Sequence, residues 1–183
     1  MRLFISGEVP LEIKKEFLII QEKVKKEKIN GRWVKPSLSH LTLIFLGETK
    51  KEKLPKIKKI LNSVTNSYSP FAFSLEKISA FPSPTQAKII ALFLRKEDEK
   101  IDSFLREVQK SFKKENIWFD PKPFIPHLTL CRLKIPKNIE KLTKVIKIKN
   151  SKFLIKEISL KQSFLDAQGP LYKNLKTFCL KQK

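Results

Sequence analysis

The sequence predicts an α+β fold of two pseudo-symmetric lobes, each with a mainly antiparallel sheet and covering helices, with a cleft between the lobes. The first observation is a repeated tetrapeptide, because HLTL occurs at residues 40–43 and again at residues 127–130. The second is the order of elements, since each half reads as strand, helix, loop and then a His-x-Thr strand. The third is that strands alternate with helices through loops of varied length, which favours α+β.

The first half takes its elements from apolar periodicity and turn residues. Ile13, Phe17, Ile20 and Val24 recur on one helical stripe, and Val9-Pro10 marks the turn before them. The elements predicted for this half are a strand at residues 3–7, helices at 11–28 and 51–67, the first His-x-Thr strand, and a strand that begins near residue 71.

The second half repeats this order after the turn at residues 82–85. Phe104, Leu105, Val108 and Phe112 form the apolar stripe of its long helix. The elements predicted here are a strand at residues 87–94, a helix at 97–116, the second His-x-Thr strand after the loop PKPFIP, a shorter helix near 138–147, and strands near 153–155, 158–166 and 176–180.

The composition bounds the class of protein and its partners. A chain of 183 residues fits one domain, or two small lobes that share a core. Thirty-nine Lys and Arg against 18 Asp and Glu give a net charge of +21, which favours a polyanionic partner, and nucleic acid first. The alternative is a Lys-rich surface that reflects codon bias or life at high temperature, because the lysines are spread along the chain.

Targeting and cysteine patterns point to the cytoplasm. The first residues, MRLFISGEVP, do not resemble a signal peptide, and no apolar stretch reaches the ~18 residues of a membrane span. Cys131 and Cys179 have neither metal-site spacing nor the context of a secreted disulfide protein. We expect a reducing compartment, no contact with a membrane, and a monomer.

The repeated motif carries the chemistry. In a strand His40 and Thr42 share one face while Leu41 and Leu43 take the other, and the second copy repeats this with His127 and Thr129. The leucines anchor each strand, and the imidazole and hydroxyl lie about 6 to 7 Å apart along the opposite face.

If an approximate two-fold axis relates the halves, the two polar faces meet across the cleft. Two imidazoles can then act as base and acid on one phosphate ester, while two hydroxyls hold its non-bridging oxygens. This chemistry needs no metal. The aspartates form no recognisable metal cluster, and these two histidines are the only ones in the chain.

With these residues in view, the chain resembles the two-histidine phosphoesterases, and within them the RNA 2′,3′-cyclic phosphodiesterase (2′-5′ RNA ligase) family. The resemblance covers nearly the whole chain. Its segments are RLFISGEVP, WVKPSLSHLTLIFLGE, ISAFPSPTQAKIIALFL, PFIPHLTLCRLK and SLKQSFLDAQGPLYKNLKTFCL.

The resemblance implies a single bilobal phosphodiesterase domain over residues 1–183, without metal or other cofactor. Its members open 2′,3′-cyclic phosphates at RNA ends to 2′-phosphomonoesters, and some ligate tRNA halves through a 2′-5′ bond. It assigns His40 as general acid at the leaving 3′ oxygen and His127 as general base on water, with Thr42 and Thr129 on the phosphate.

Four further positions depend on local geometry. The resemblance puts Arg132 on the phosphate, but strand parity points it away from His127 unless the strand ends or bulges there. Phe45 matches a family aromatic that could stack on a base, but its parity is that of the core leucines, which favours packing. Trp33 and Trp118, near the two motifs, are expected to be partly buried rather than to form an RNA platform.

Two other functions remain compatible with the sequence. The same site could act on a small cyclic nucleotide or sugar phosphate, although the charge of +21 favours RNA. The protein could also bind RNA without turning it over, although that would leave two complete His-x-Thr motifs unexplained.

Overall fold

Two antiparallel sheets form the framework of the protein. The computed structural model describes residues 1–166 and 169–181. One sheet has the strand order β3-β1-β8-β9 and the other β2-β6-β5-β4-β7. The strands are β1 (Arg2–Gly7), β2 (Gly31–Trp33), β3 (Leu41–Glu48), β4 (Phe71–Phe81), β5 (Ala87–Lys96), β6 (His127–Lys137), β7 (Lys152–Ile155), β8 (Glu157–Asp166) and β9 (Gly169–Cys179).

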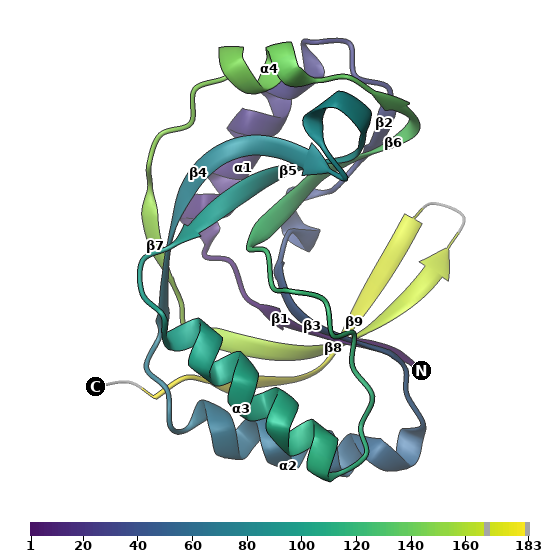
Figure 1. The fold of residues 1–183 in the computed structure, drawn as a ribbon, viewed down its shortest axis with the longest axis vertical. Helices are drawn as coiled ribbons and strands as arrows, with labels where there is room; N and C mark the ends of the chain where they lie inside the picture. Colours follow the sequence, from purple (N-terminus) through teal and green to yellow (C-terminus); the bar gives the residue numbers. More distant parts are fainter. Residues whose placement is uncertain (167–168, 182–183) are drawn as a thin grey trace.

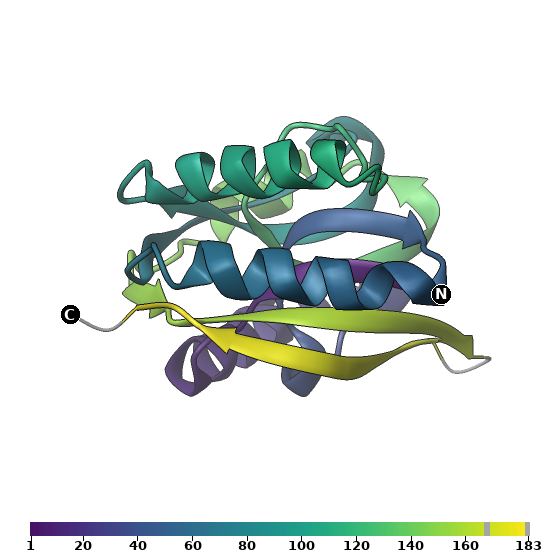
Figure 2. The same ribbon diagram turned by 90° about the horizontal axis from the view of Figure 1, so that it is seen from below.

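Helices cover the outer face of each sheet, as Figure 1 shows. They are α1 (Leu11–Lys25), α2 (Leu54–Thr65), α3 (Lys100–Lys114) and α4 (Glu140–Val145). Helices α2 and α3 lie side by side against the first sheet (Figure 2), where Lys56 forms a 2.6 Å ion pair with Glu115. Helix α1 packs on the second sheet, since the Gln21 amide donates to the carbonyls of Val34 and Leu130.

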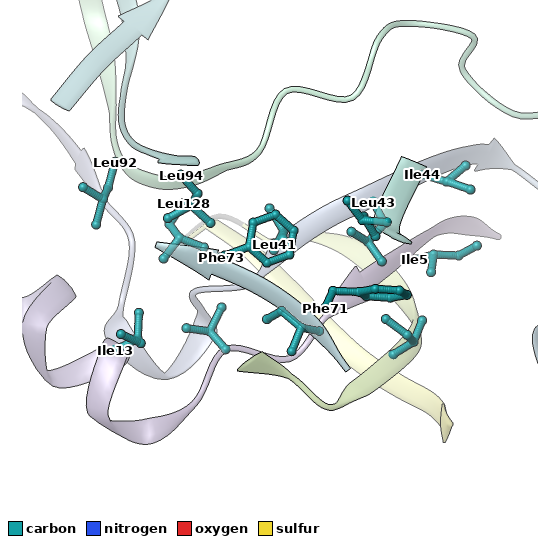
Figure 3. Close-up of a cluster of buried hydrophobic side chains, with 14 of the residues drawn as sticks. Ile5, Ile13, Leu41, Leu43, Ile44, Phe71, Phe73, Leu92, Leu94 and Leu128 are labelled. Carbon is teal, nitrogen blue, oxygen red and sulfur yellow. The ribbon is translucent and has the colours of Figure 1, made fainter. Parts of the chain in front are cut away.

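Each half of the chain therefore gives a helix to the other lobe. Helix α1 precedes the first motif but covers the sheet of the second, and α3 precedes the second motif but covers the sheet of the first. The lobes also share one apolar core, which includes Ile5 and Leu41 of the first sheet and Phe73, Leu92 and Leu128 of the second (Figure 3). Because close-packed interiors resist deformation, this core fixes the two His-x-Thr strands relative to each other.

The predicted fold class is confirmed, and the differences concern the ends of elements. Helix α1 ends at Lys25 rather than residue 28, and Lys28 has a positive φ of 52° that no helix can contain. Helix α2 begins at Leu54 because Pro55, with its fixed φ and no N–H to donate, fits the first turn. Strands β4 and β9 are longer than predicted.

One strand was not predicted at all. Strand β2 has three residues, too few for an alternating pattern, and it forms by pairing with β6 at the edge of the sheet. Within the described residues, no helix is long and apolar enough to span a membrane. Cys131 and Cys179 are free thiols.

Candidate active site

The two histidines lie at equivalent points, each at the start of the strand that carries its motif. His40 directly precedes β3 and His127 opens β6. Leu41 is fully buried and Thr42 only partly, as the alternation predicts. The second motif repeats the pattern, with two buried leucines and with His127 and Thr129 only partly buried.

Each imidazole is oriented by the backbone two residues before it. His40 Nδ1 lies 2.8 Å from the carbonyl oxygen of Leu38, and His127 Nδ1 lies 2.7 Å from that of Ile125. A carbonyl oxygen can only accept, so Nδ1 carries the proton and Nε2 of each neutral ring keeps its lone pair. Both rings can thus take up a proton at Nε2 and return it.

A β-bulge places Arg132 on the face of the second histidine. In the pairing of β5 with β6, Ile90 opposes Cys131 and Ala91 opposes Thr129, so Leu130 is an extra residue. The bulge reverses the parity beyond it, which leaves Leu130 and Cys131 both buried and Arg132 exposed. The Arg132 charge reaches the imidazole, since it helps to lower the pKa of His127.

The first motif has the same irregularity, and it corrects the expectation for Phe45. In the pairing of β1 with β3, Ile5 opposes Ile44 and Ser6 opposes Thr42, so Leu43 is the extra residue. Phe45 therefore faces the same side as Thr42 and is 52% exposed rather than packed in the core. Phe45 and Arg132 occupy the same position in the two motifs, five residues after each histidine.

Aromatic rings surround both imidazoles. The His40 ring centroid lies 5.0 Å from that of Phe4 and 5.0 Å from that of Tyr172. The His127 centroid lies 4.8 Å from that of Phe81 and 6.2 Å from that of Phe93. These rings exclude water, and the loss of hydration disfavours the imidazolium form.

Burial is accordingly the main cause of low pKa values at both histidines. It lowers the pKa of His40 to about 4, against an opposing hydrogen bond to Leu38. Burial also lowers the pKa of His127, with a smaller contribution from Arg132. Both rings are therefore mainly neutral at pH 7 in the free protein.

Charges of the two lobes act on each other across the site. The charge of His127, on the second sheet, contributes to the lowered pKa of His40 beside the first. Burial raises the pKa of Tyr172 on β9, and the Arg132 charge on β6 partly opposes this rise. The charge of His127 thus acts on His40, and the charge of Arg132 acts on His127 and Tyr172.

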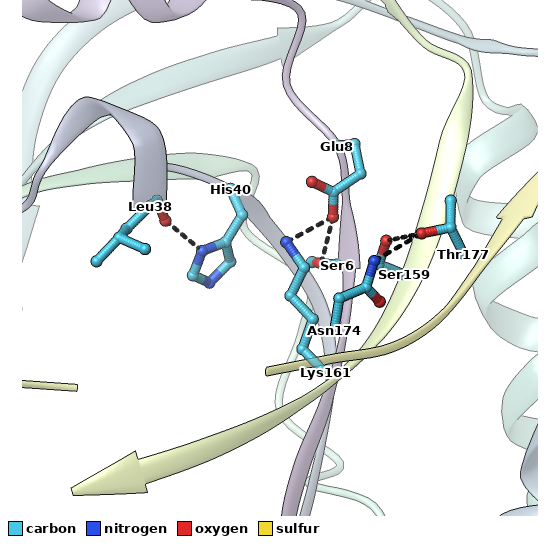
Figure 4. Close-up of polar contacts among 8 residues, drawn as sticks. All are labelled: Ser6, Glu8, Leu38, His40, Ser159, Lys161, Asn174 and Thr177. Atoms are coloured by element: carbon cyan, nitrogen blue, oxygen red, sulfur yellow. Dashed lines mark hydrogen bonds and ion pairs between the residues drawn. The ribbon is translucent and has the colours of Figure 1, made fainter. Parts of the chain in front are cut away.

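Sequence reasoning did not single out Lys161 and Glu8, which lie beside His40. Lys161 Nζ is 2.6 Å from a Glu8 carboxylate oxygen (Figure 4). Both charges also affect the pKa of His40, which Lys161 lowers and Glu8 raises. The alternation of side chains along β8 places Lys161 on the opposite face of the strand from Leu160. Only the sheet pairing shows that β8 lies next to β1, which brings Lys161 to the side of His40. Tyr172 of β9 also contacts His40.

The two tryptophans differ from each other. Trp33 is partly buried in β2, as predicted, and Lys25 lies 5.5 Å from its ring centroid. Trp118 is 62% exposed, so the prediction of partial burial is wrong for this residue. It lies over Gly47, where the absence of a side chain gives it room.

The described residues contain no cluster of three or more His, Cys, Asp or Glu side chains able to hold a metal ion. A hollow of about 370 Å³ lies between the end of α1 and the start of α4, lined by Glu27, Lys137 and Glu140 among others. It includes neither histidine, and four of its eight lining residues are charged. We therefore place the candidate chemistry at the two motifs.

Comparison with known proteins agrees with this duplicated architecture. The model of the LigT-like phosphoesterase family matches the chain twice, at residues 8–91 and 92–172. The RNA 2′,3′-cyclic phosphodiesterase of Archaeoglobus fulgidus is 34% identical over 182 residues, which covers 97% of this chain and 99% of that protein. The protein of the same name from Methanocaldococcus jannaschii is 32% identical over 189 residues, which covers 96% of this chain and 99% of that protein.

Solved structures share the fold. The crystal structure of TT0787 from Thermus thermophilus superposes with a TM-score of 0.82 at 26% identity and covers 98% of both chains. Escherichia coli LigT complexed with 3′-AMP superposes with a TM-score of 0.75 at 21% identity and covers 99% of this chain and 98% of that one. The likeness to LigT concerns the fold alone.

Proposed function

Because the chain belongs to the LigT-like phosphoesterase family, we propose that it is an RNA 2′,3′-cyclic phosphodiesterase whose residues 1–183 act as one bilobal domain. Relatives of that name match it over nearly their whole length. The observation that carries the proposal is the pair of imidazoles, each with Nδ1 bound to a carbonyl and Nε2 left to exchange a proton. We propose that the product is a 2′-phosphomonoester.

In the proposed mechanism the imidazoles have complementary roles. His127 removes a proton from water, the water oxygen bonds to phosphorus, and the bond to the 3′ oxygen breaks as His40 protonates that oxygen. His40 has a pKa of about 4 in the free protein, so it must gain its proton when substrate binds. A bound phosphate anion favours this because it stabilises the imidazolium form.

Thr42, Thr129 and Arg132 hold the phosphate in this proposal. Each threonine shares the exposed face of its strand with a histidine, and its hydroxyl can donate to a non-bridging oxygen. Arg132, brought to that face by the bulge, offers a planar guanidinium suited to two phosphate oxygens.

The same site can form a 2′-5′ linkage without new groups. If the 5′ hydroxyl of a second RNA replaces water, it gives its proton to His127 as its oxygen bonds to phosphorus, the 3′ oxygen leaves with a proton from His40, and the strands are joined. We propose that this reaction accompanies hydrolysis, with tRNA halves as substrates. We further propose that the enzyme is a metal-free monomer of the cytoplasm, where the free thiols of Cys131 and Cys179 would remain reduced.

The test is incubation with a short RNA that ends in a 2′,3′-cyclic phosphate, in the presence of EDTA, followed by identification of the product. We expect a 2′-phosphate, and its loss in both His40→Ala and His127→Ala, with circular dichroism as the control for folding. A 3′-phosphate product, or activity that EDTA abolishes and a metal restores, would contradict the proposal. Faster turnover of a cyclic mononucleotide would instead indicate a small substrate.

A further inference from the structure

Lys161 lies on the same face of the first sheet as the first motif. In the register of β1 with β8, Phe4 opposes Lys161, and in that of β1 with β3, Phe4 opposes Phe45. Directly opposed residues in a sheet share a face. Phe4 also contacts the His40 ring, so Lys161 belongs to the row of side chains beside that imidazole.

The ammonium of Lys161 is held in place and is only partly satisfied. Its side chain is 14% exposed, and Glu8 is the one partner that the described residues provide, at 2.6 Å. An ammonium has three N–H donors, which leaves donors for another acceptor. A lysine is rarely buried unless it is paired, so Glu8 accounts for its position while leaving part of its donor capacity unused.

Glu8 is fixed as a carboxylate by its own surroundings. Burial opposes its ionisation, but the Lys161 ammonium and the hydroxyls of Ser159 and Ser6 outweigh this effect and lower its pKa. Ser6 donates to Glu8 at 3.1 Å, and Ser159 lies 3.0 Å from Thr177 (Figure 4). This network fixes Glu8, and Glu8 in turn fixes the end of Lys161.

The Lys161 ammonium also lies close to the proton-exchanging group. Figure 4 shows the Lys161 chain extending past the His40 ring toward Glu8, and the Lys161 charge contributes to the low pKa of His40. The other charged or titratable groups around His40 are Glu8, His127 and Tyr172. The second lobe supplies Arg132, and the first supplies only Phe45 at the equivalent position.

We propose that Lys161 is a further phosphate-contacting residue, which Glu8 positions to donate to a phosphate oxygen on the His40 side. This inference rests on the proposed function. A cyclic phosphodiester carries one negative charge, whereas the phosphomonoester product carries nearly two at neutral pH. One cation from each lobe, Lys161 and Arg132, therefore matches the charge that develops during the reaction better than the charge of the substrate.

The test uses Lys161→Met, which keeps most of the length and apolar stem of the side chain and removes the charge. Lys173→Met is the matched control, because Lys173 is exposed and lies one position from Asn174, the cross-strand partner of Lys161. We expect kcat for the cyclic-phosphate RNA to fall about 100-fold in Lys161→Met, with a smaller change in KM. The Lys173→Met variant should keep the kcat of the wild-type protein. Lys161→Arg should recover part of the loss.

Two measurements do not depend on turnover, and they separate this inference from the proposed function. Binding of inorganic phosphate should weaken about 10-fold in Lys161→Met and remain unchanged in Lys173→Met. Titration of the His40 ring by NMR should give a higher pKa in Lys161→Met and a lower pKa in Glu8→Gln. If the wild-type protein fails to open the cyclic phosphate, the proposed function is lost while these results still decide the role of Lys161.

A purely structural ion pair would give a different pattern. Lys161→Met leaves Glu8 as an unpaired buried carboxylate and could unfold, so the double variant Lys161→Met/Glu8→Gln, which has neither charge, is made beside it. We expect the folded double variant to have the same loss of phosphate affinity. Wild-type affinity for phosphate in that variant would overturn the proposal.

Discussion

At the scale of single residues, the two imidazoles are alike in orientation but differ in surroundings. Both donate Nδ1–H to the carbonyl two residues earlier. His40 lies beside Lys161 and Tyr172, and His127 beside Phe81 and near the charge of Arg132. Buried between aromatic rings and near positive charges, both resist protonation until an anion arrives.

This resistance predicts the pH dependence of the reaction. The active form needs one imidazole protonated and the other neutral, so kcat/KM should be bell-shaped. The pKa of His40 is about 4 and that of His127 is below its usual 6.5, so the maximum should lie below pH 6.5. The kcat profile should lie at higher pH, because bound phosphate raises both pKa values. Initial rates from pH 4 to 9 test this, and a flat profile would contradict it.

Arg132 allows a second prediction at this scale. Its charge helps to lower the pKa of His127, so Arg132→Met should raise that pKa, measured by NMR titration of the ring. The same variant should lower kcat/KM about 100-fold through the lost phosphate contact. Arg132→Lys is the control, since it keeps the charge but not the bidentate geometry. An unchanged pKa of His127 in Arg132→Met would mean that the guanidinium does not reach the ring.

At the scale of elements, the β-bulges decide which side chains reach the site. After Leu43 and after Leu130 the strand parity reverses, and the residue five positions beyond each histidine turns to the active face. A regular strand without a bulge would have placed Phe45 on the face of the core leucines and turned Arg132 away from His127. Each motif with its bulge therefore places three side chains on the active face. These are the histidine, the threonine and the residue five positions beyond the histidine.

The bulges also mark where sequence reasoning ends. The parity rule gave the faces of His40, Thr42, His127 and Thr129, and the alternating burial in both motifs agrees with it, because these residues precede each bulge. It was wrong for Phe45, because nothing in the sequence LTLIF distinguishes a strand with a bulge from a regular strand. It could not find Lys161, since the pairing of β1 with β8 joins segments about 150 residues apart in sequence.

Gly47 gives a stability prediction for the end of strand β3. It has a φ of 54°, and a Cβ built there would lie 2.9 Å from the Trp118 ring. Gly47→Ala should lower the free energy of unfolding by about 1 to 3 kcal/mol, through backbone strain and this contact. Urea denaturation measures the loss. In a Trp118→Ala background the loss should shrink to the strain alone, and an equal loss in both backgrounds would show that the ring moves freely away.

At the scale of the whole molecule, the exchange of helices and the common core hold two half-sites in one arrangement. Helix α1 covers the second sheet, α3 covers the first, and a single apolar cluster joins them. The packing of this core therefore fixes the two His-x-Thr strands relative to each other. The chain as a whole carries a net charge of +21, which favours a polyanionic partner.

That charge predicts a steep dependence of RNA binding on salt. Neutralised phosphates release counterions, with a slope of about −0.7 per phosphate contact for a single strand. We expect the logarithm of the association constant to fall with the logarithm of the salt concentration with a slope of about −2 or steeper. Fluorescence anisotropy with His127→Ala, which should bind without turnover, measures it. An affinity independent of salt would show that the surface lysines do not contact the RNA.

The central claim is that His40 and His127 act as one unit on one phosphate. It is tested most directly by single-turnover rates of cyclic-phosphate opening in His40→Ala, His127→Ala and the double variant. Groups that act together are not additive, so we expect the double variant to be about as slow as either single variant. A double variant slower by the product of the two single losses would mean that the imidazoles contribute independently, and the account of acid and base at one phosphate would be wrong.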